Sequence, residues 1–354
     1  MNSILVTGGA GFVGSNLAIA LATRHPDWRI TAFDNLYRKG SELNLGRLAD
    51  AGVEFLRGDV RSLEDLEKAG PVDALIECSA EPSVMSGIDG DTSYLVETNL
   101  TGAYNCLELA RRRGSQFIFL STSRVYPLRG LRDLTLEEAP TRFELSGDQP
   151  QPGISSKGVS EAMPLAGPRT LYGSTKLAAE LLTTEFGEMF GIPTVINRCG
   201  VIAGPWQMGK VDQGVFTHWM LAHLDRKPLS YIGYGGSGKQ VRDLLHIDDL
   251  IDLVELQVLE PEIWDGQTFN VGGGREVSLS LLESSGICAR LTGNSLEITP
   301  VPEDRAGDVP VYLSDCSALF AHTSWRPQRD AETILRDIYE WIDSDRDLLE
   351  GVLR

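Results

Sequence analysis

The sequence is poor in cysteine and contains no C-x-x-C pair. Its five cysteines are scattered over 354 residues, so neither a disulfide framework nor a cysteine zinc site is indicated, and we expect no metal. Apolar runs are also short, and none approaches the roughly 20 residues that cross a bilayer. We therefore expect reduced thiols in a cytoplasmic protein without a membrane-spanning segment.

Basic residues are few beside the acidic ones. The chain has 32 Lys and Arg against 50 Asp and Glu, a net charge of −18 at pH 7. A charge of this sign disfavours nonspecific binding to nucleic acid or to an anionic membrane surface. An anionic substrate would therefore need a local basic patch. Because the first predicted strand begins almost at the initiating methionine, we also expect no signal peptide.

What the sequence does contain is a glycine-rich turn close to its start. Residues 4–6 predict a buried strand and residues 15–24 predict a helix. Between them stand Gly8, Gly11 and Gly14. Bare backbone at such glycines lets a pyrophosphate approach closely, and the start of the helix supplies free N–H groups and the positive end of its dipole. A tight strand-to-helix turn could use the same glycines, but the acid that ends the second predicted strand favours dinucleotide binding.

That acid is Asp34, which ends a strand predicted for residues 29–33. It stands about 20 residues past the last glycine, where an acid binds the hydroxyls of the adenosine ribose. A carboxylate there repels the 2′-phosphate of NADP, so Asp34 predicts NAD. Asn35, Arg38 and Lys39 follow in a loop at the carboxyl end of the strand, the edge at which doubly wound sheets bind ligands. A solvated loop is the alternative for the two basic residues.

Predicted strands and helices alternate regularly through the first half of the chain. Such alternation implies right-handed crossovers and a parallel sheet. We predict an α/β fold with a doubly wound, Rossmann-type parallel sheet of about seven strands and a smaller α/β lobe that binds substrate. The larger domain would span residues 1–198, with residues 237–263 contributing, and the lobe would span residues 199–354 discontinuously. Residues 127–169, rich in Pro, Gly, Ser and Glu, predict a long surface excursion, either a functional lid or a disordered loop.

Tyr172 and Lys176 open a helix predicted to run through residue 188. Residues four apart share one helical face. A nearby ammonium stabilises phenolate and so lowers the pKa of a tyrosine from about 10 toward the working pH, as a general base requires. Alone, this pair is a common pattern of solvated helix faces. Together with the glycine-rich turn and the Ser/Thr cluster at residues 121–123, it indicates a catalytic pair.

These motifs and an Arg242-Asp243 turn occur in one order along the chain. In that order they resemble the extended short-chain dehydrogenase/reductase family, which includes nucleotide-sugar epimerases and dehydratases. The resemblance runs over nearly the whole chain. Within the family, residues 34–40, 212–214 and 238–243 are similar to the CDP-tyvelose/CDP-paratose 2-epimerases.

The resemblance implies a role for each matched residue. Tyr172 would deprotonate a sugar hydroxyl, and Thr122 would hydrogen-bond the same sugar oxygen. Lys176 would lower the pKa of Tyr172 and bond to the nicotinamide ribose. Asp34 would hold the adenosine ribose and Asp59 the adenine amino group, although Asp59 could instead cap the following helix. The implied NAD contacts are Gly8, Gly11, Phe12, Val13, Asp34, Asn35, Arg38, Lys39, Asp59, Val60, Ser79, Ala80, Asn99, Tyr172 and Lys176.

The resemblance also implies a substrate and a partner. The implied substrate contacts are Ser123, Arg124, Gln213, Arg242 and Arg305. Arg242 and Arg305 would grip a substrate diphosphate, because guanidinium forks match phosphate oxygens in pairs; a surface ion pair is the alternative for each. The substrate would be a nucleotide-diphosphate sugar, with a CDP-sugar favoured. Family members often pair through a four-helix bundle, so a homodimer is expected.

The residues after Thr122 select among the reactions of the family. Dehydratases usually carry an Asp-Glu pair there as acid and base, whereas this chain has Ser123-Arg124, so elimination lacks its proton carriers. We therefore expect an NAD-dependent isomerase that inverts C2 of a nucleotide-activated sugar through a transient keto intermediate, with NAD staying bound. The alternatives are a UDP-sugar 4-epimerase, a nucleotide-sugar dehydratase, an oxidoreductase that releases NADH, and a cofactor-sensing protein without catalysis.

Overall fold

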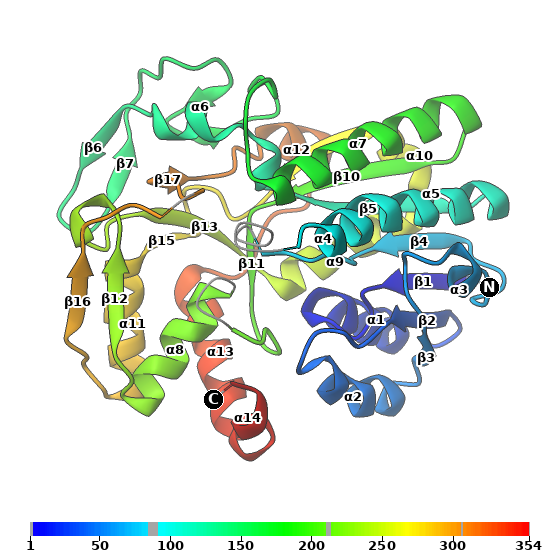
Figure 1. Cartoon of the computed structure of the whole chain (residues 1–354), viewed down its shortest axis with the longest axis horizontal. Coiled ribbons are helices and arrows are strands. Elements are labelled where there is room, and N and C mark those ends of the chain that lie inside the picture. Colours follow the sequence, from blue (N-terminus) through cyan, green and yellow to red (C-terminus); the bar gives the residue numbers. More distant parts are fainter. Residues whose placement is uncertain (1–2, 84–90, 210–213, 306, 354) are drawn as a thin grey trace. The chain divides into compact units, whose positions relative to one another are not determined.

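Figure 1 shows the computed structural model, which describes residues 3–83, 91–209, 214–305 and 307–353. The chain forms two compact units. Unit 1 comprises Met1–Thr122, Leu171–Arg198 and Leu250–Thr268, and unit 2 comprises Ser123–Thr170, Cys199–Asp249 and Phe269–Arg354. The predicted substrate contact Gln213 lies outside the described residues.

A seven-stranded sheet dominates unit 1 and has the strand order β14-β10-β5-β4-β1-β2-β3. Its strands are β1 (Ser3–Thr7), β2 (Arg29–Asp34), β3 (Glu54–Arg57), β4 (Ala74–Glu77), β5 (Gln116–Thr122), β10 (Thr194–Cys199) and β14 (Gln267–Val271). From β1 the chain winds outward through β2 to β3 and then returns to the other side of β1 with β4, and these neighbours pair in parallel. This reversal beside β1 is the switch point at which such sheets bind ligands. The predicted doubly wound fold is confirmed.

The helices of unit 1 alternate with these strands, as predicted. They are α1 (Phe12–Arg24), η1 (Ser41–Leu43), α2 (Asn44–Asp50), α3 (Leu63–Glu67), α4 (Ser93–Val96), η2 (Glu97–Thr101), α5 (Gly102–Arg113), α7 (Leu171–Phe190), α9 (Ile247–Leu259, of which residues 250–259 belong to unit 1) and α10 (Pro261–Trp264). The single helix predicted for residues 94–113 is therefore three consecutive segments, of which η2 is a π-helix. Figure 1 shows the sheet with these helices packed along it.

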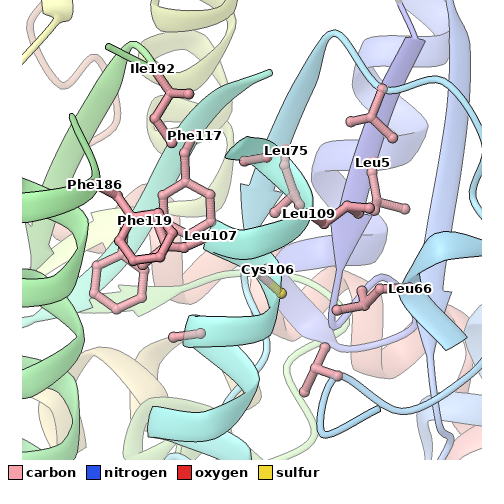
Figure 2. Packing of buried hydrophobic residues seen from close by; sticks show 14 of the residues in the cluster. Leu5, Leu66, Leu75, Cys106, Leu107, Leu109, Phe117, Phe119, Phe186 and Ile192 are labelled. Carbon is pink, nitrogen blue, oxygen red and sulfur yellow. The ribbon is translucent and has the colours of Figure 1, made fainter. Parts of the chain in front are cut away.

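The core of unit 1 forms where the central strands meet α5 and α7. Side chains of Leu5, Leu75 and Phe117 from the sheet are fully buried in it, together with Leu107 of α5 (Figure 2). Strands that are covered by helices on both faces need apolar residues in succession, and the burial of all seven residues of β5 shows this pattern. The rigid sheet thus holds the carboxyl ends of its strands in place.

Unit 2 is built from shorter elements. Its elements are η3 (Ser123–Val125), α6 (Leu128–Arg132), β6 (Leu136–Glu138), β7 (Phe143–Leu145), β8 (Ile154–Ser155), β9 (Gly158–Val159), β11 (Val201–Ala203), α8 (Val215–Asp225), β12 (Leu229–Ile232), η4 (Tyr234–Gly236), β13 (Val241–His246), β15 (Ser278–Ser280), α11 (Leu281–Thr292), β16 (Ile298–Val301), β17 (Val311–Tyr312), α12 (Ser317–His322), α13 (Ala331–Ser344) and α14 (Arg346–Leu353). β13 pairs with β11, β15 and β17, and β12 pairs with β16. Unit 2 thus contains both helices and short strands, as expected for a smaller α/β lobe.

Residues 127–169 are more ordered than the sequence suggested. They contain α6 and two hairpins, β6–β7 and β8–β9. Most of this segment is exposed or partly exposed, as expected of a surface excursion, but Leu145, Val159 and Met163 are buried. A few apolar side chains anchor the Pro- and Gly-rich segment within unit 2.

In the part of the chain that the structure describes, no helix combines the length and the apolar character needed to cross a membrane.

Candidate active site

The glycine-rich turn between β1 and α1 has the shape of a phosphate-binding loop. The N–H of Gly11 donates to the carbonyl of Gly8 at 2.9 Å, and Gly8 has a φ of 62°, which glycine adopts without strain. A Cβ added to Gly14 would lie 2.2 Å from that same carbonyl oxygen. α1 begins at Phe12, and its N-cap Gly11 has no side chain to occupy the first N–H groups of the helix. The turn therefore fits a pyrophosphate, and the contacts expected from Gly8, Gly11, Phe12 and Val13 stay predictions.

Asp34 ends β2 and ties the glycine-rich turn to that strand. Its Oδ2 accepts the N–H of Ala10 at 3.1 Å and its Oδ1 accepts the N–H of Leu36 at 2.7 Å. The carbonyl of Ala10 accepts the side-chain amide of Asn44 at 2.9 Å. Burial raises the pKa of Asp34, and its backbone hydrogen bonds oppose that rise. The carboxylate is thus held at the turn, where sequence spacing placed it, and its binding of ribose stays a prediction.

Asp59 follows β3 and joins a polar cluster. The side-chain amide of Asn35 donates to Asp59 Oδ2 at 3.0 Å, and Arg61 Nη2 lies 2.7 Å from the same oxygen. The hydrogen bond from Arg61 is the main reason that the pKa of Asp59 falls to about 2. The alternative that Asp59 caps the next helix is wrong, because Ser62 is the N-cap of α3. Val60, the other predicted contact here, is buried.

An aromatic pair borders this polar cluster. The rings of Tyr37 and Tyr94 stack with centroids 4.2 Å apart, and the guanidinium of Arg61 lies 5.0 Å from the Tyr94 centroid. Tyr37 is 66% exposed. The predicted cofactor contacts Arg38 and Lys39 follow it, the first half-buried and the second exposed. Sequence reasoning missed Tyr37, Tyr94 and Arg61, because stacking between a loop and a distant helix leaves no local pattern.

Asn99 connects the loop after β4 to α7. Its Oδ1 accepts the N–H of Glu81 at 2.8 Å, and its amide donates to the Glu81 carbonyl at 3.1 Å and to Thr175 Oγ1 at 3.3 Å. Asn99 is 1% exposed and lies in the π-helical segment η2. Ser79 and Ala80 begin the loop that it clamps. Asn99 thus positions the loop of the predicted cofactor contacts, and its own contact with NAD stays a prediction.

The predicted catalytic residues lie on β5 and α7, which pack against each other in unit 1. Thr122 is the last residue of β5 and is buried. Tyr172 is half-buried in the first turn of α7, and Lys176, one turn later, is 2% exposed. Ser121 Oγ donates to Glu180 Oε1 at 2.5 Å and so pins the end of β5 to the helix.

A buried carboxyl group that sequence reasoning missed faces Lys176. Glu77 Oε2 lies 3.5 Å from Lys176 Nζ, and the exposed fraction of the Glu77 side chain is 1%. The Lys176 ammonium also lies 4.0 Å from the centroid of the Phe119 ring. Burial raises the pKa of Glu77, and the positive charge of Lys176 opposes this rise. The sequence signal that could have indicated a buried charge here is the single glutamate at the end of the apolar strand β4.

The predicted substrate contacts that the structure describes lie in unit 2. Arg242 is part of β13 rather than a turn, and its Nη2 lies 2.5 Å from Asp308 Oδ1, so the alternative of an ion pair is observed. Arg124 Nη1 donates to the Gly307 carbonyl at 3.1 Å. Arg305 is exposed. Arg242 and Arg124 therefore grip the same turn, which sequence reasoning did not foresee.

Ser123, the remaining predicted substrate contact, begins η3, and its carbonyl accepts the N–H of Tyr126 at 3.3 Å. Arg132, which was not singled out in the sequence, donates from Nε to the Asp308 carbonyl at 3.1 Å. Three guanidinium groups thus contact residues 307–309 of unit 2. The expectation that a local basic patch receives an anionic substrate stays a prediction for this cluster.

Comparison with known proteins places the chain in a family. The model described as "NAD dependent epimerase/dehydratase family" matches residues 4–272. The chain is 30% identical to CDP-paratose 2-epimerase of Salmonella typhi, over 96% of this chain and 99% of that protein. It is 28% identical to dTDP-glucose 4,6-dehydratase of Mycobacterium tuberculosis (strain CDC 1551 / Oshkosh), over 96% of this chain and 92% of that protein.

A solved structure agrees with this assignment. UDP-glucose 4-epimerase of Thermus thermophilus, crystallised as a complex with NAD, superposes with a TM-score of 0.77 at 26% identity, over 96% of this chain and 99% of that chain. Its fold matches the seven-stranded sheet described here, and its bound NAD is the dinucleotide that the glycine-rich turn predicts. This chain therefore belongs to the NAD dependent epimerase/dehydratase family and is an NAD-dependent enzyme built on a Rossmann-type sheet.

Proposed function

We propose that the enzyme inverts C2 of a nucleotide-activated sugar, of the CDP-paratose/CDP-tyvelose type, and keeps NAD bound throughout its cycle. Similarity alone does not choose the reaction, because the epimerase and dehydratase relatives are 30% and 28% identical to this chain. The observation that carries the choice is the Ser123-Arg124 pair after Thr122. Neither side chain replaces a carboxylate as acid or base, and Arg124 is bonded to the Gly307 carbonyl. Elimination of water therefore lacks its proton carriers, whereas epimerisation needs none beyond the tyrosine.

In this proposal, residues of unit 1 transfer the proton of the sugar hydroxyl and stabilise the charge that this transfer creates. Tyr172 takes the proton of the sugar hydroxyl and later returns it, and Thr122 orients the same oxygen. Lys176 stabilises the phenolate with its ammonium, because an opposite charge nearby favours the ionised form. NAD, which the glycine-rich turn and Asp34 would hold, would supply a hydride acceptor and donor for the sugar carbon. Since the proton and the hydride both return, no added cofactor is consumed.

Arg242 and Arg305 would hold the substrate diphosphate in unit 2. Arg242 is paired with the carboxylate of Asp308 at 2.5 Å, so a diphosphate would have to share or replace this partner. A phosphate group offers the same paired acceptor oxygens as a carboxylate. The CDP-sugar preference remains part of this proposal.

The test is a product analysis without added NAD. The purified protein is incubated with a panel of CDP-, UDP-, dTDP- and GDP-sugars, and the products are identified by NMR. We expect conversion of a CDP-sugar with inversion at C2 alone. Inversion only at C4 would replace the 2-epimerase by a 4-epimerase, loss of water would make the enzyme a dehydratase, and accumulation of free NADH would make it a net oxidoreductase.

We also propose that the enzyme works as a homodimer through the outer face of α5 and α7. These two helices pack together in unit 1, and they expose large apolar side chains. The exposed fractions are 45% for Tyr104, 63% for Leu181, 68% for Met189 and 45% for Phe190. An apolar set of this size on adjacent helices is typical of an interaction surface.

The five cysteines, all within the described residues, are thiols rather than disulfides, and we propose the reducing cytoplasm as the place of action.

Leu181→Asp should convert this dimer into a monomer, because a charge would be buried at the apolar contact. The measurement is the molar mass in solution by sedimentation or light scattering. Leu348→Asp is the matched control, since Leu348 on α14 of unit 2 is also exposed, at 47%. A monomeric unsubstituted protein, or a Leu181→Asp variant that stays dimeric, would refute this interface.

A further inference from the structure

Glu77 occupies an unusual place for a carboxylate. It is the last residue of β4, in the interior of the seven-stranded sheet. Its backbone pairs with Thr7 of β1 on one side and with Phe119 of β5 on the other. The residues before it, Ala74 to Ile76, are apolar and buried. A charge at this point is costly unless a partner compensates it.

Lys176 supplies that partner from α7. Its Nζ lies 3.5 Å from Glu77 Oε2, and the side chains are 2% and 1% exposed. On another side the ammonium contacts the face of Phe119, whose ring belongs to the apolar core shown in Figure 2. Among the described residues, Glu77 is the carboxylate within salt-bridge distance of this ammonium. The two charges therefore depend on each other for compensation.

The other polar and titratable groups around the pair do not replace either charge. Cys106 of α5 faces it with a thiol whose pKa is raised by burial and by the charge of Glu77, so the thiol stays neutral. The backbone N–H of Ser79 bonds to the Glu77 carboxylate. One turn along α7, Glu180 is already paired with Arg198 at 2.8 Å. Each buried charge on this face of α7 thus has its own counter-ion.

We propose that Glu77 is a positioning residue that holds the Lys176 ammonium charged and in place one helical turn from Tyr172. This inference rests on the proposed function, in which Lys176 stabilises the phenolate. A lone ammonium in the core would give up its proton readily, because burial disfavours the charged form. A neutral amine would no longer stabilise the phenolate, and proton transfer by Tyr172 would fail although Tyr172 itself was intact.

The experiment titrates Lys176 directly. Protein labelled with carbon-13 at lysine Cε is followed by NMR across pH, and the Lys176 signal is assigned with Lys176→Met. In Glu77→Gln, which keeps the shape of the side chain, we expect Lys176 to lose its proton at least about two pH units lower than in the unsubstituted protein. Glu77→Asp, which keeps the charge, should restore most of the difference. Cys106→Ala, which changes a buried neighbour without changing charge, should leave the titration unaltered.

The pH profile of turnover provides a second measurement. With Glu77→Gln the alkaline limb of kcat should move to lower pH in step with the Lys176 titration, while KM changes little. An unchanged Lys176 titration in folded Glu77→Gln, or an Asp variant that behaves like the Gln variant, would overturn the proposal. If Glu77→Gln does not fold, the Glu77→Asp titration and pH profile decide, because the proposal requires both to stay close to those of the unsubstituted protein. The NMR titration needs neither substrate nor cofactor, so its failure is distinguishable from failure of the proposed epimerase activity.

Discussion

Tyr172→Phe should lower kcat by at least about a thousandfold while NAD binding changes little. The substitution removes one hydroxyl and keeps the ring, so the half-buried first turn of α7 should fold as before. Without that oxygen the sugar hydroxyl has no base beside it, and hydride cannot leave a carbon whose oxygen keeps its proton. The loss should therefore fall on kcat rather than on KM. Turnover is measured with single-turnover assays, and NAD affinity is measured separately by calorimetry.

Tyr339→Phe is a matched control for this prediction. Tyr339 lies on α13 of unit 2 and is half-buried like Tyr172, so the same hydroxyl is removed from a comparable environment. Its activity should equal that of the unsubstituted enzyme. A Tyr172→Phe enzyme that retained a tenth or more of its turnover would remove Tyr172 from its assigned role.

The second large effect is expected from Gly14→Ala in the glycine-rich turn. A Cβ at Gly14 would stand 2.2 Å from the carbonyl oxygen of Gly8 and 2.9 Å from Gly9 Cα. Both neighbours are backbone and cannot rotate away, so the turn and the start of α1 must separate. Such overpacking typically costs about 1–3 kcal/mol. We expect NAD affinity to fall about a hundredfold, since about 3 kcal/mol corresponds to that factor.

Gly46→Ala is the control for Gly14→Ala, because it shows what replacing a glycine by alanine does where no atom is close. Gly46 lies within α2, and a Cβ there would meet no atom within 4 Å. Alanine should raise the free energy of unfolding by about 0.5–1 kcal/mol and leave NAD binding unchanged. The measurements are NAD titration and urea unfolding of both variants. Equal NAD affinity for Gly14→Ala and the unsubstituted protein would show that this turn does not cradle the cofactor.

The parts of the fold that depend on local pattern could be predicted from the sequence. The strand, glycines and helix around Gly8 follow one another in the chain, and the apolar runs of a doubly wound sheet are each covered on both faces. A doubly wound parallel sheet of about seven strands followed from this alternation, and the observed sheet has seven. Asp34 could be placed for the same reason, because its distance from the glycines is fixed by one helix and one strand.

The features that could not be predicted depend on contacts between distant segments. Glu77 and Lys176 are 99 positions apart and meet only because β4, β5 and α7 assemble in one order. Asn99 was expected to touch the cofactor, but the structure also gives it a clamp on the loop at Glu81. The pairing of Arg242 with Asp308 depends in the same way on the register within unit 2. The sequence near each of these residues does not indicate which distant residue it will contact.

The most direct test of the account follows a deuterium label on the sugar. CDP-paratose carrying deuterium at C2 is incubated with the enzyme in ordinary water without added NAD, and the product is examined by NMR. We predict a product inverted at C2 that retains the deuterium on that carbon, because the hydride leaves and returns within one active site. A product that has exchanged its label for solvent hydrogen, or that is inverted at another carbon, would contradict the account.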